Sequence, residues 1–268
     1  MTHRSTVADR NLALSTWYES QSRSLPWRRT PDPYYTLVSE FMLQQTQVER
    51  VLPKFRAFVE RWPTAEDLAE SLPSQVLEMW SGLGYNSRAL RLRSSAQIIA
   101  SSGWPKSPQG LTELPGVGPY TARAIASIAF GESVPAIDTN LRRVLSRWFG
   151  ARIDGDELVS FAQVCLGEPA GTWNQAMMDL GATICRPRNP ECSVCPVSDW
   201  CTDPTVYAPP TRQSRFRGST RELRGALVRA SLDGADLYAT GTSLGRTKKQ
   251  IDTAIETLRT EGLLPSEC

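Results

Sequence analysis

The stretch that decides the fold is Leu114-Pro115-Gly116-Val117-Gly118-Pro119-Tyr120-Thr121-Ala122. Two glycines two positions apart permit a tight turn with positive φ angles, and Pro119 suits the first position of a helix. The apolar run from Ala124 to Phe130 continues that helix, and Gly131 is expected to end it. Such a turn aims backbone amides outward at a helix N-terminus, which suits a phosphate oxygen. The alternative is an ordinary helical hairpin that binds nothing.

On both sides of this turn, apolar residues recur at helical spacing, and no stretch sustains the period of two that a strand requires. One face is formed by Val48, Val51, Leu52, Phe55, Val59 and Trp62, and another by Leu141, Val144, Leu145 and Trp148. Thr46–Glu49 has the spacing of a capping box, which would start the first of these helices, and Pro53 should kink it. We therefore expect a mostly α-helical fold.

The charge of the chain is more informative in its distribution than in its sum. The 268 residues carry a formal net charge of +2, which is too small to indicate a nucleic-acid partner. Arginine is nevertheless clustered, as Arg88, Arg91 and Arg93, as Arg142, Arg143 and Arg147, and as Arg212, Arg215, Arg217, Arg221 and Arg224. Any one cluster fits a solvated helix face or a linker. Three clusters in a near-neutral chain favour phosphate contact.

The cysteines are also clustered. The chain has no run of 18 apolar residues and no apolar N-terminal segment, so we expect a cytoplasmic protein without membrane contact. In that reducing compartment, four cysteines within 17 residues (Cys185, Cys192, Cys195 and Cys201) indicate a metal site rather than disulfides. Zinc is the alternative, but zinc sites usually combine two short Cys-x-x-Cys motifs and this segment has one. The spacing resembles the iron–sulfur loop of endonuclease III-type and MutY-type glycosylases, which favours one [4Fe-4S] cluster.

Two carboxylates stand in contrasting environments. Asp138 precedes the helix that begins near Leu141, where it suits an N-cap, and the helix dipole would hold it ionised. An ionised carboxylate beside a sugar can stabilise an oxocarbenium-like transition state. Glu40 lies in the apolar segment Leu37–Leu43, and if it faces inward, burial favours its neutral, proton-donating form. The alternatives are a simple helix cap and a partly exposed helix glutamate, but together the pair suits hydrolysis of an N-glycosidic bond.

Five strings tie these features to one family. The segment Ser39-Glu40-Phe41-Met42-Leu43-Gln44-Gln45-Thr46-Gln47 resembles the signature of MutY-type adenine DNA glycosylases. Leu25–Arg28, Gly82–Tyr85 and Asn174–Ala182 also resemble that family, and Leu114–Ala122 resembles its helix-hairpin-helix. The resemblance runs in order from about Trp17 to Cys201. It implies a base excision repair enzyme that flips adenine out of double-stranded DNA containing mismatched or oxidised guanine and hydrolyses its glycosidic bond.

The resemblance also implies roles for individual residues. Glu40 would protonate the departing adenine and later activate water, and Asp138 would stabilise or trap the sugar cation, with Tyr120 and Asn140 in support. The base pocket would be lined by Trp27, Arg28, Leu43 and Gln175. Contacts to DNA would come from Gln45, Thr46, Leu83 and Tyr85, which fill the stack and read the opposing guanine, and from the hairpin residues Gly116, Val117 and Gly118.

Two departures from the wider superfamily carry information. Tyr120 stands where the bifunctional endonuclease III type has a lysine nucleophile, so we expect a monofunctional enzyme. Many family members end in a Nudix-like domain that reads 8-oxoguanine, but only about 50 residues follow the linker here. A preference for 8-oxoguanine over guanine is therefore not implied. The related tyrosine-bearing enzymes leave thymine or uracil mismatch excision as an alternative, and a non-catalytic iron–sulfur damage sensor is the alternative from another class.

The predicted architecture has two helical lobes and a short tail. Residues 30–137 would form a six-helix lobe with the hairpin, and residues 1–29 and 138–207 a second lobe with the cluster loop. Because Glu40 and Asp138 come from different lobes, we expect the active site between them. Residues 208–222 read as a basic linker and residues 223–268 as a small helical or winged-helix-like module, with helix, turn and helix. We expect the protein to act as a monomer.

Overall fold

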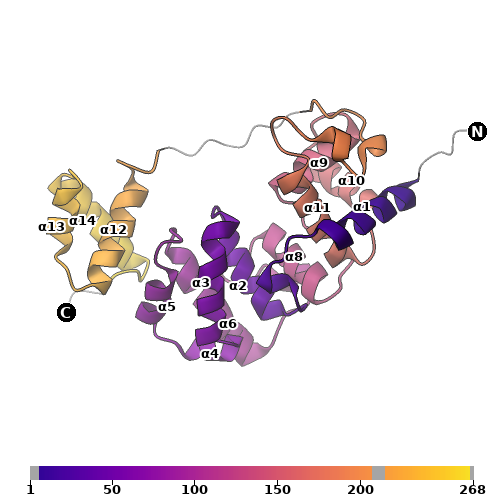
Figure 1. Cartoon of the computed structure of the whole chain (residues 1–268). Coiled ribbons are helices and arrows are strands. Elements are labelled where there is room, and N and C mark those ends of the chain that lie inside the picture. Colours follow the sequence, from indigo (N-terminus) through magenta and orange to yellow (C-terminus); the bar gives the residue numbers. More distant parts are fainter. Residues whose placement is uncertain (1–5, 207–214, 266–268) are drawn as a thin grey trace, which may run out of the picture. The chain divides into compact units, whose positions relative to one another are not determined.

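All regular structure in the described part of this computed structural model, residues 6–206 and 215–265, is helical (Figure 1). The mostly α-helical prediction is therefore confirmed. The chain forms two compact units. Unit 1 comprises Met1–Leu37, Pro105–Glu113 and Val117–Thr211, and unit 2 comprises Val38–Trp104, Leu114–Gly116 and Arg212–Cys268. The helix α2 (Pro33–Leu43) begins in unit 1 and ends in unit 2.

Unit 1 is built around one central helix. Its elements are α1 (Val7–Gln21), η1 (Pro26–Arg28), α7 (Pro108–Leu111), α8 (Pro119–Ala129), α9 (Thr139–Phe149), α10 (Gly155–Cys165), α11 (Ala170–Thr183), η2 (Cys192–Val194) and η3 (Ser198–Trp200). The helix α11 packs against α1, α8 and α9. Its apolar side chains Trp173, Met177 and Leu180 join Leu14, Leu141 and Leu145 in a single buried cluster.

Glycines let α11 approach its neighbours closely. A Cβ atom on Gly171 would lie 2.6 Å from the carbonyl oxygen of Ser127 in α8, and one on Gly181 would lie 2.6 Å from Cβ of Asn140 in α9. Real Cβ atoms do not tolerate such distances, so only glycine fits at these crossings. The segment carrying Asp138 and Asn140 is thereby held against α11.

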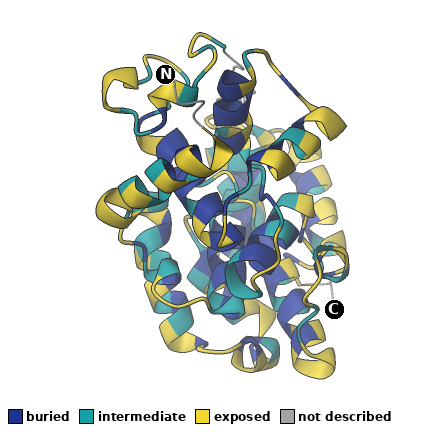
Figure 2. Cartoon of the chain, turned by 90° about the vertical axis from the view of Figure 1, so that its right-hand side faces the viewer, coloured by how far each residue is buried: buried dark blue, intermediate teal, exposed yellow. Residues whose placement is uncertain are grey.

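Unit 2 contains α3 (Val48–Arg61), α4 (Ala65–Glu70), α5 (Pro73–Trp80), α6 (Ser87–Ser102), α12 (Thr220–Leu232), α13 (Leu237–Ser243) and α14 (Lys248–Thr260). The helix α6 packs against α4 and α5, and α5 also contacts α3. In the core, the ring of Phe58 meets Trp62 edge-on at a centroid distance of 4.9 Å and Trp80 at 6.3 Å. Figure 2 shows buried and exposed residues interspersed along each helix, as expected of amphipathic helices with one face in the core.

The C-terminal helices differ from the prediction in number. Three helices are present where helix, turn and helix were expected. The additional helix, α13, has the sequence LYATGTS, and its glycine and threonines are weak helix formers, so the segment was predicted to be a turn. The helix α12 packs against α13, α14 and α5. Leu258, Leu263 and Leu264 are buried. These residues therefore form a packed helical module.

The start of α3 corrects one local prediction. The predicted capping box at Thr46–Glu49 is wrong, because the N-cap is Gln47 and its side chain makes no capping hydrogen bond. The hydroxyl of Thr46 instead donates to the carbonyl oxygens of Gln44 and Leu83, both at 3.3 Å. A tertiary contact with a second loop has thus replaced the local cap. Pro53 lies inside α3, as predicted.

The compact units divide the chain differently from the predicted lobes. Residues 117–137 group with α9, α10 and α11, because α8 packs directly on α11. The C-terminal helices group with α3 to α6 through the contact between α12 and α5. No helix within residues 6–206 and 215–265 has the length and apolar character needed to cross a lipid bilayer.

We predict that Gly171→Ala lowers the free energy of unfolding by about 1–3 kcal/mol, because the added Cβ overpacks two backbones that cannot separate independently. The measurement is thermal melting of the purified protein with its cofactor. Gly225→Ala in α12 is the matched control, because a Cβ there meets nothing within 4 Å. That control should be neutral or stabilising by roughly 0.5–1 kcal/mol. Equal melting temperatures for Gly171→Ala and the wild type would contradict the packing argument.

Candidate functional site

The hairpin between α7 and α8 leads into a helix that begins at Pro119, as its sequence predicts, but it contains one glycine with a positive φ angle rather than two. Gly116 adopts φ +84°, whereas Gly118 is the extended N-cap of α8 with φ −86°, so a single glycine makes the turn. Val117 is buried, and Gly116 and Gly118 are exposed. A Cβ atom on Gly116 would lie 2.9 Å from a ring carbon of Phe41. No side chain caps the first turn of α8, so its backbone amides can donate to an anion such as a phosphate oxygen.

One buried arginine organises two loops of unit 2. The guanidinium of Arg88 donates to the carbonyl oxygens of Phe41 (2.6 Å), Met42 (3.3 Å), Gln44 (2.6 Å), Leu83 (3.2 Å) and Gly84 (3.0 Å) and to the hydroxyl of Thr46 (3.3 Å). The loop that follows α2 is thereby tied to the loop that follows α5. Burial lowers the pKa of Arg88 to about 10, which still leaves it charged at neutral pH. Arg88 belongs to one of the three arginine clusters that together favoured phosphate contact, but it is buried and binds the protein's own backbone.

These two loops carry the residues expected to contact DNA. Gln45 and Tyr85 adopt left-handed backbone angles, with φ +57° and +48°, which non-glycine residues seldom do. Tyr85 is exposed, and the Arg88 guanidinium lies 5.6 Å from the centre of its ring. Leu83, by contrast, is buried at 4% exposure. The loops therefore present Gln45 and Tyr85 outward from strained backbone, while Leu83 faces the core.

Glu40 is a buried residue. Glu40 lies in the last turns of α2, between the buried residues Ser39 and Phe41, and is 8% exposed. The inward orientation that the sequence left conditional is therefore observed. Leu43, expected in the base pocket, ends the same helix and is partly buried.

Asp138 belongs to unit 1 and caps α9, as predicted. One of its carboxylate oxygens accepts from the amide of Leu141 at 2.7 Å, and the other accepts from Nδ2 of Asn140 at 2.8 Å. Burial raises the pKa of Asp138 more than these hydrogen bonds and the nearby Arg143 lower it, so the net pKa lies above the ordinary value. The expectation that the helix N-terminus would dominate is therefore corrected, because removal from water is the larger effect.

Arg143 links the Asp138 segment to the cysteine loop. Its Nη2 donates to Oδ1 of Asn140 at 2.9 Å and to the carbonyl oxygen of Gly181 at 2.6 Å, and its Nε donates to the carbonyl oxygen of Cys185 at 2.7 Å. Arg143 is 6% exposed. It was also interpreted from sequence as a possible phosphate ligand, and the structure places it inside instead.

Asn174 holds the irregular segment that leads to Asp138. Its side chain is fully buried, accepts from the amide of Ala136 at 2.9 Å, and donates to the carbonyl oxygen of Val134 at 3.0 Å and the hydroxyl of Ser127 at 2.9 Å. A buried amide with every group satisfied fixes the backbone around it. Sequence reasoning gave Asn174 no role, since its partners lie about 40 residues away.

The expected base-pocket residues of unit 1 lie around Asp179. Arg28 donates both terminal nitrogens to the carboxylate of Asp179, at 2.8 and 3.0 Å, and Arg23 donates at 2.7 Å. Burial raises the pKa of Asp179, but the bonds and charges of Arg28 and Arg23 outweigh burial and hold it below its ordinary value. Trp27 is buried in η1. Asp179 was not identified from sequence.

Gln175 is oriented by a tyrosine. The hydroxyl of Tyr18 in α1 donates to Oε1 of Gln175 at 2.8 Å. Burial raises the pKa of Tyr18, so its hydroxyl remains a donor. The carboxamide nitrogen of Gln175 is thereby turned away from Tyr18. Tyr120, in the first turn of α8, is partly buried, and its hydroxyl lies 3.9 Å from the sulfur of Met178.

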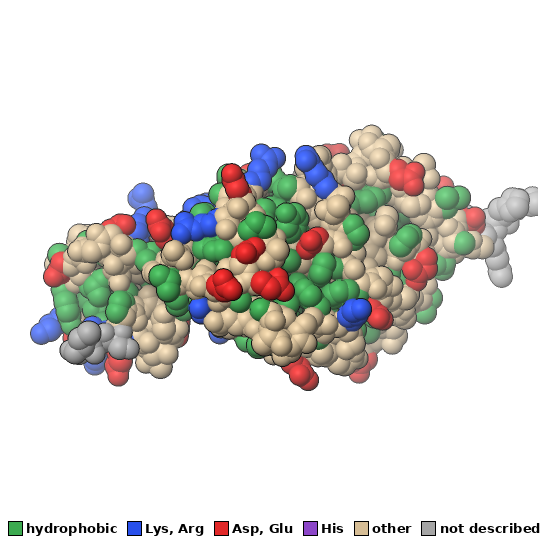
Figure 3. Space-filling view, turned by 90° about the horizontal axis from the view of Figure 1, so that it is seen from below, with side chains coloured by type: hydrophobic (Ala, Val, Ile, Leu, Met, Phe, Trp, Pro, Cys, Tyr) green, Lys and Arg blue, Asp and Glu red, His purple; other side chains and the backbone are tan. Residues whose placement is uncertain are grey.

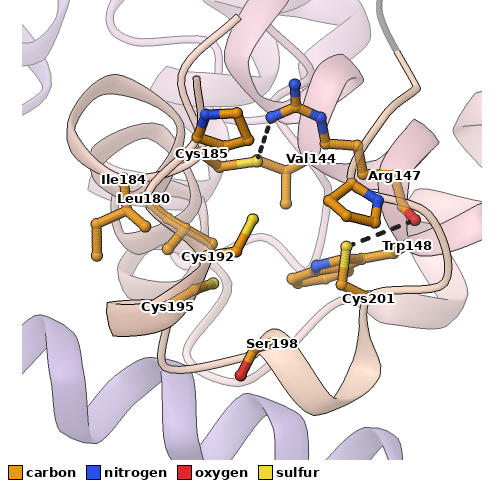
Figure 4. Close-up of a pocket in the computed structure, with 12 residues that line it drawn as sticks. Val144, Arg147, Trp148, Leu180, Ile184, Cys185, Cys192, Cys195, Ser198 and Cys201 are labelled. Atoms are coloured by element: carbon orange, nitrogen blue, oxygen red, sulfur yellow. Dashed lines mark hydrogen bonds between the residues drawn. The ribbon is translucent and has the colours of Figure 1, made fainter. Parts of the chain in front are cut away.

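The four clustered cysteines line one cavity of about 90 Å³ (Figure 4). Its walls are Val144, Arg147, Trp148, Leu180, Ile184, Cys185, Pro190, Cys192, Cys195, Ser198, Cys201 and Pro204. Four thiols around one cavity can hold either a single zinc ion or a cluster that binds each thiolate through a different iron.

Arg147 lies against this cavity from α9. It donates to Sγ of Cys185 at 3.0 Å, to the carbonyl oxygen of Arg186 at 3.0 Å and to that of Val206 at 3.1 Å. Burial, reinforced by the other cysteines, raises the pKa of the Cys201 thiol to about 11. Such a thiol becomes a ligand only when a metal binds the sulfur and the proton is released to solvent. Arg147 is 2% exposed, so it too stabilises a loop rather than binding phosphate.

The exposed arginines beside the cavity differ from Arg147. Arg186 forms an ion pair with Glu191, and both side chains are about half exposed. Arg188 is exposed in the same loop. Both arginines therefore lie on the surface of the cysteine loop, unlike the buried Arg147. Arg212 lies outside the described residues.

Comparison with known proteins agrees with this geometry. A family model described as "HhH-GPD superfamily base excision DNA repair protein" matches residues 38–163. A second, described as "Iron-sulfur binding domain of endonuclease III", matches residues 185–201. The cysteine loop therefore holds an iron–sulfur cluster, which confirms the predicted cofactor.

Curated relatives match nearly the whole chain. The chain is similar to an adenine DNA glycosylase of Mycobacterium tuberculosis, with 38% identity over 96% of this chain and 90% of the relative. One from Mycolicibacterium smegmatis is 42% identical over 80% of this chain and 78% of the relative. Among solved structures, a thermostable thymine-DNA glycosylase matches with a TM-score of 0.68 and 29% identity, covering 73% of this chain and 95% of that structure.

We predict that Arg147→Ala yields protein with about 10-fold weaker retention of its iron, because a buried donor to a ligand sulfur and to the loop backbone is lost. The purified variant is diluted into buffer that contains a chelator. Loss of the cluster is then followed by the iron content of the protein and by its visible absorbance. Arg142→Ala is the control on the same helix, because Arg142 is exposed and pairs only with Asp154 in the described part of the chain. Retention equal to wild type in Arg147→Ala would show that Arg147 does not stabilise the cluster.

Proposed function

The chain belongs to the adenine DNA glycosylase family, and we propose that Glu40 and Asp138 are the two groups that carry out its reaction. The protein is a hydrolase of N-glycosyl bonds that binds DNA and removes adenine in base excision repair. It leaves an abasic site without a lysine imine, since Tyr120 occupies the hairpin position. We further propose that the excised adenine lies opposite guanine or 8-oxoguanine and that the enzyme acts as a monomer.

Glu40 is the proton donor. The residue is buried in α2 among apolar neighbours, and a positioned glutamic acid is a common proton donor in catalysis. Protonation of a ring nitrogen of adenine lets the base leave as a neutral molecule. The resulting carboxylate can then accept a proton from the attacking water. The observation that carries this assignment is the burial of a single glutamate within the matched part of the chain, at the end of α2.

Asp138 stabilises the sugar cation. Two hydrogen bonds, from Leu141 and Asn140, fix its carboxylate oxygens, and Arg143 fixes Asn140 in turn. Burial makes the lone negative charge of Asp138 costly. A positive charge that develops on the deoxyribose relieves that cost, so the carboxylate favours the transition state over the ground state.

The opposing base is read by the loops that Arg88 holds. Gln45 and Tyr85 are presented outward from left-handed backbone, and Thr46 bridges the loops through Leu83. Strained backbone of this kind persists only where surrounding contacts impose it, and it concentrates at functional sites. Amide, hydroxyl and phenol groups can hydrogen-bond a guanine edge, and Tyr85 can also stack in the gap left by a flipped base.

A second candidate substrate is thymine opposite guanine. The observation that favours it is the similarity to the thermostable thymine-DNA glycosylase at 29% identity. Single-turnover excision on duplexes with 8-oxoguanine:A, G:A, G:T and G:U separates the two. We expect adenine release from the first two only. Release of thymine at a comparable rate would overturn the adenine assignment.

We predict that Glu40→Gln slows adenine excision by at least about 100-fold, because glutamine cannot supply the proton. Binding to a G:A duplex should persist, since the side chain keeps its shape. Glu60→Gln, in which an exposed glutamate of α3 is changed, is the control and should retain full activity. Near-normal turnover by Glu40→Gln would remove Glu40 from the mechanism.

We predict that Tyr18→Phe slows excision by about 10-fold, because loss of one hydrogen bond frees the Gln175 carboxamide to turn. With its oxygen held by Tyr18, Gln175 presents an N–H donor, which suits a ring nitrogen of adenine. Gln175→Glu removes that donor and should cost at least as much. The two changes combined should cost no more than Gln175→Glu alone, since both act through one donor. Multiplicative losses would show that Tyr18 acts independently of Gln175.

A further inference from the structure

The helices α13 and α14 form a helix-turn-helix. Residues 244–247 connect them, and Gly245 adopts φ +71° within this turn. The amides of Leu244 and Arg246 both donate to the carbonyl oxygen of Gly241, at 3.2 Å each, which closes the C-terminal end of α13. A four-residue turn containing glycine between two helices is typical of the DNA-binding motif. The reaction assigned above makes no use of this motif.

A close contact fixes the crossing of the two helices. Gly241 is buried, and a Cβ atom there would lie 2.6 Å from both Cδ1 and Cγ1 of Ile251 in α14. Ile251 is itself 1% exposed. The side chain of Ile251 thus occupies the space that any residue larger than glycine would fill. The helix α12 completes the core with the buried residues Leu227 and Val228, so α14 is held rigidly with one face outward.

The outward face of α14 begins with two lysines. Lys248 and Lys249 are exposed, as is Thr253 one turn later. Neither lysine joins an ion pair in the described part of the chain, whereas Arg224 pairs with Glu261 and Arg246 with Glu222. Residues 215–265 carry nine Lys or Arg and six Asp or Glu, a net +3, although the whole chain is only +2. At the left of Figure 3, several Lys and Arg side chains lie on the surface, interspersed with Asp and Glu side chains.

The module also contacts the loop expected to read DNA. Nη1 of Arg221, in α12, donates to the hydroxyl of Tyr85 at 3.2 Å. Both residues belong to unit 2. The helix α12, which packs on both α13 and α14, therefore links the helix-turn-helix to the proposed DNA-reading loop.

We propose that α13 and α14 are a second duplex-binding element, with α14 as the helix that enters the major groove of the DNA flanking the mismatch. In helix-turn-helix proteins the second helix enters the groove with its N-terminal residues against the DNA, and here those residues are Lys248 and Lys249. Lysines neutralise phosphates without reading sequence, which suits an enzyme that must act at a mismatch in any context. The proposal rests on the proposed function for the identity of the ligand as duplex DNA.

The test compares two lengths of G:A duplex with the full-length, cluster-containing protein. One duplex extends two helical turns, roughly 20 base pairs, on each side of the mismatch, and the other about 5 base pairs. Lys248→Ala/Lys249→Ala should weaken binding to the long duplex about 3- to 10-fold and lower the slope of log affinity against log salt by about two. Binding to the short duplex should not change. Thr253→Glu, which adds a negative charge on the same face, should reproduce the loss.

Arg229→Ala is the matched control, because Arg229 is exposed on α12 of the same module. It should leave both affinities unchanged. An equal loss from Arg229→Ala, or equal losses on the two duplexes, would show diffuse attraction and overturn the assignment to α14. Unchanged binding of the double-lysine variant would overturn it outright. At saturating enzyme, the double-lysine variant should excise adenine in a single turnover at the wild-type rate. If instead the wild-type protein excised no adenine, the proposed function would be wrong, and that result is distinct from a failure of the α14 proposal.

Discussion

Buried arginines that donate to backbone carbonyl oxygens are the interaction on which the functional loops depend. Arg88 joins the loops after α2 and α5, Arg143 joins the Asp138 segment to α11 and Cys185, and Arg147 joins α9 to the cysteine loop. Burial of a guanidinium is costly unless nearly all its donors are satisfied. An arginine that meets this condition fixes several carbonyl groups at once, because its donors form a rigid planar fork. Loops without regular structure thereby acquire defined positions.

These arginines also separate what sequence can predict from what it cannot. The hairpin glycines, the N-cap at Asp138 and the cysteine spacing are local, because each depends on residues within about a turn or a loop of one another. Arg88 binds carbonyl groups 44 to 47 residues away, and Asp179 binds Arg23 and Arg28 across more than 150 residues. No periodicity encodes such pairs. A buried arginine and an exposed one look identical in sequence. For that reason the clustered arginines favoured the prediction of phosphate contact.

The difference between local and distant contacts also explains which residues of the site were predicted. The sequence identified Glu40 and Asp138, and the family resemblance supplied their roles, but neither revealed the residues that hold them. Asn174 fixes the backbone before Asp138, and Arg143 fixes Asn140 beside it. The pKa of Asp138 is raised, whereas its capping position led us to expect a lowered pKa. A capping position in the sequence reveals the hydrogen bonds but not the degree of burial. The two carboxylates come from different units of the chain, so their joint action has to be measured as coupling.

A double-mutant comparison tests that coupling most directly. Single-turnover adenine release from a G:A duplex would be measured for Glu40→Gln, Asp138→Asn and the protein carrying both changes. If both groups act in one step on one deoxyadenosine, the double variant loses little more activity than the worse single variant, because either loss already disables the step. Losses that multiply would mean that the two residues act independently, and that result would contradict the account of a two-carboxylate hydrolysis.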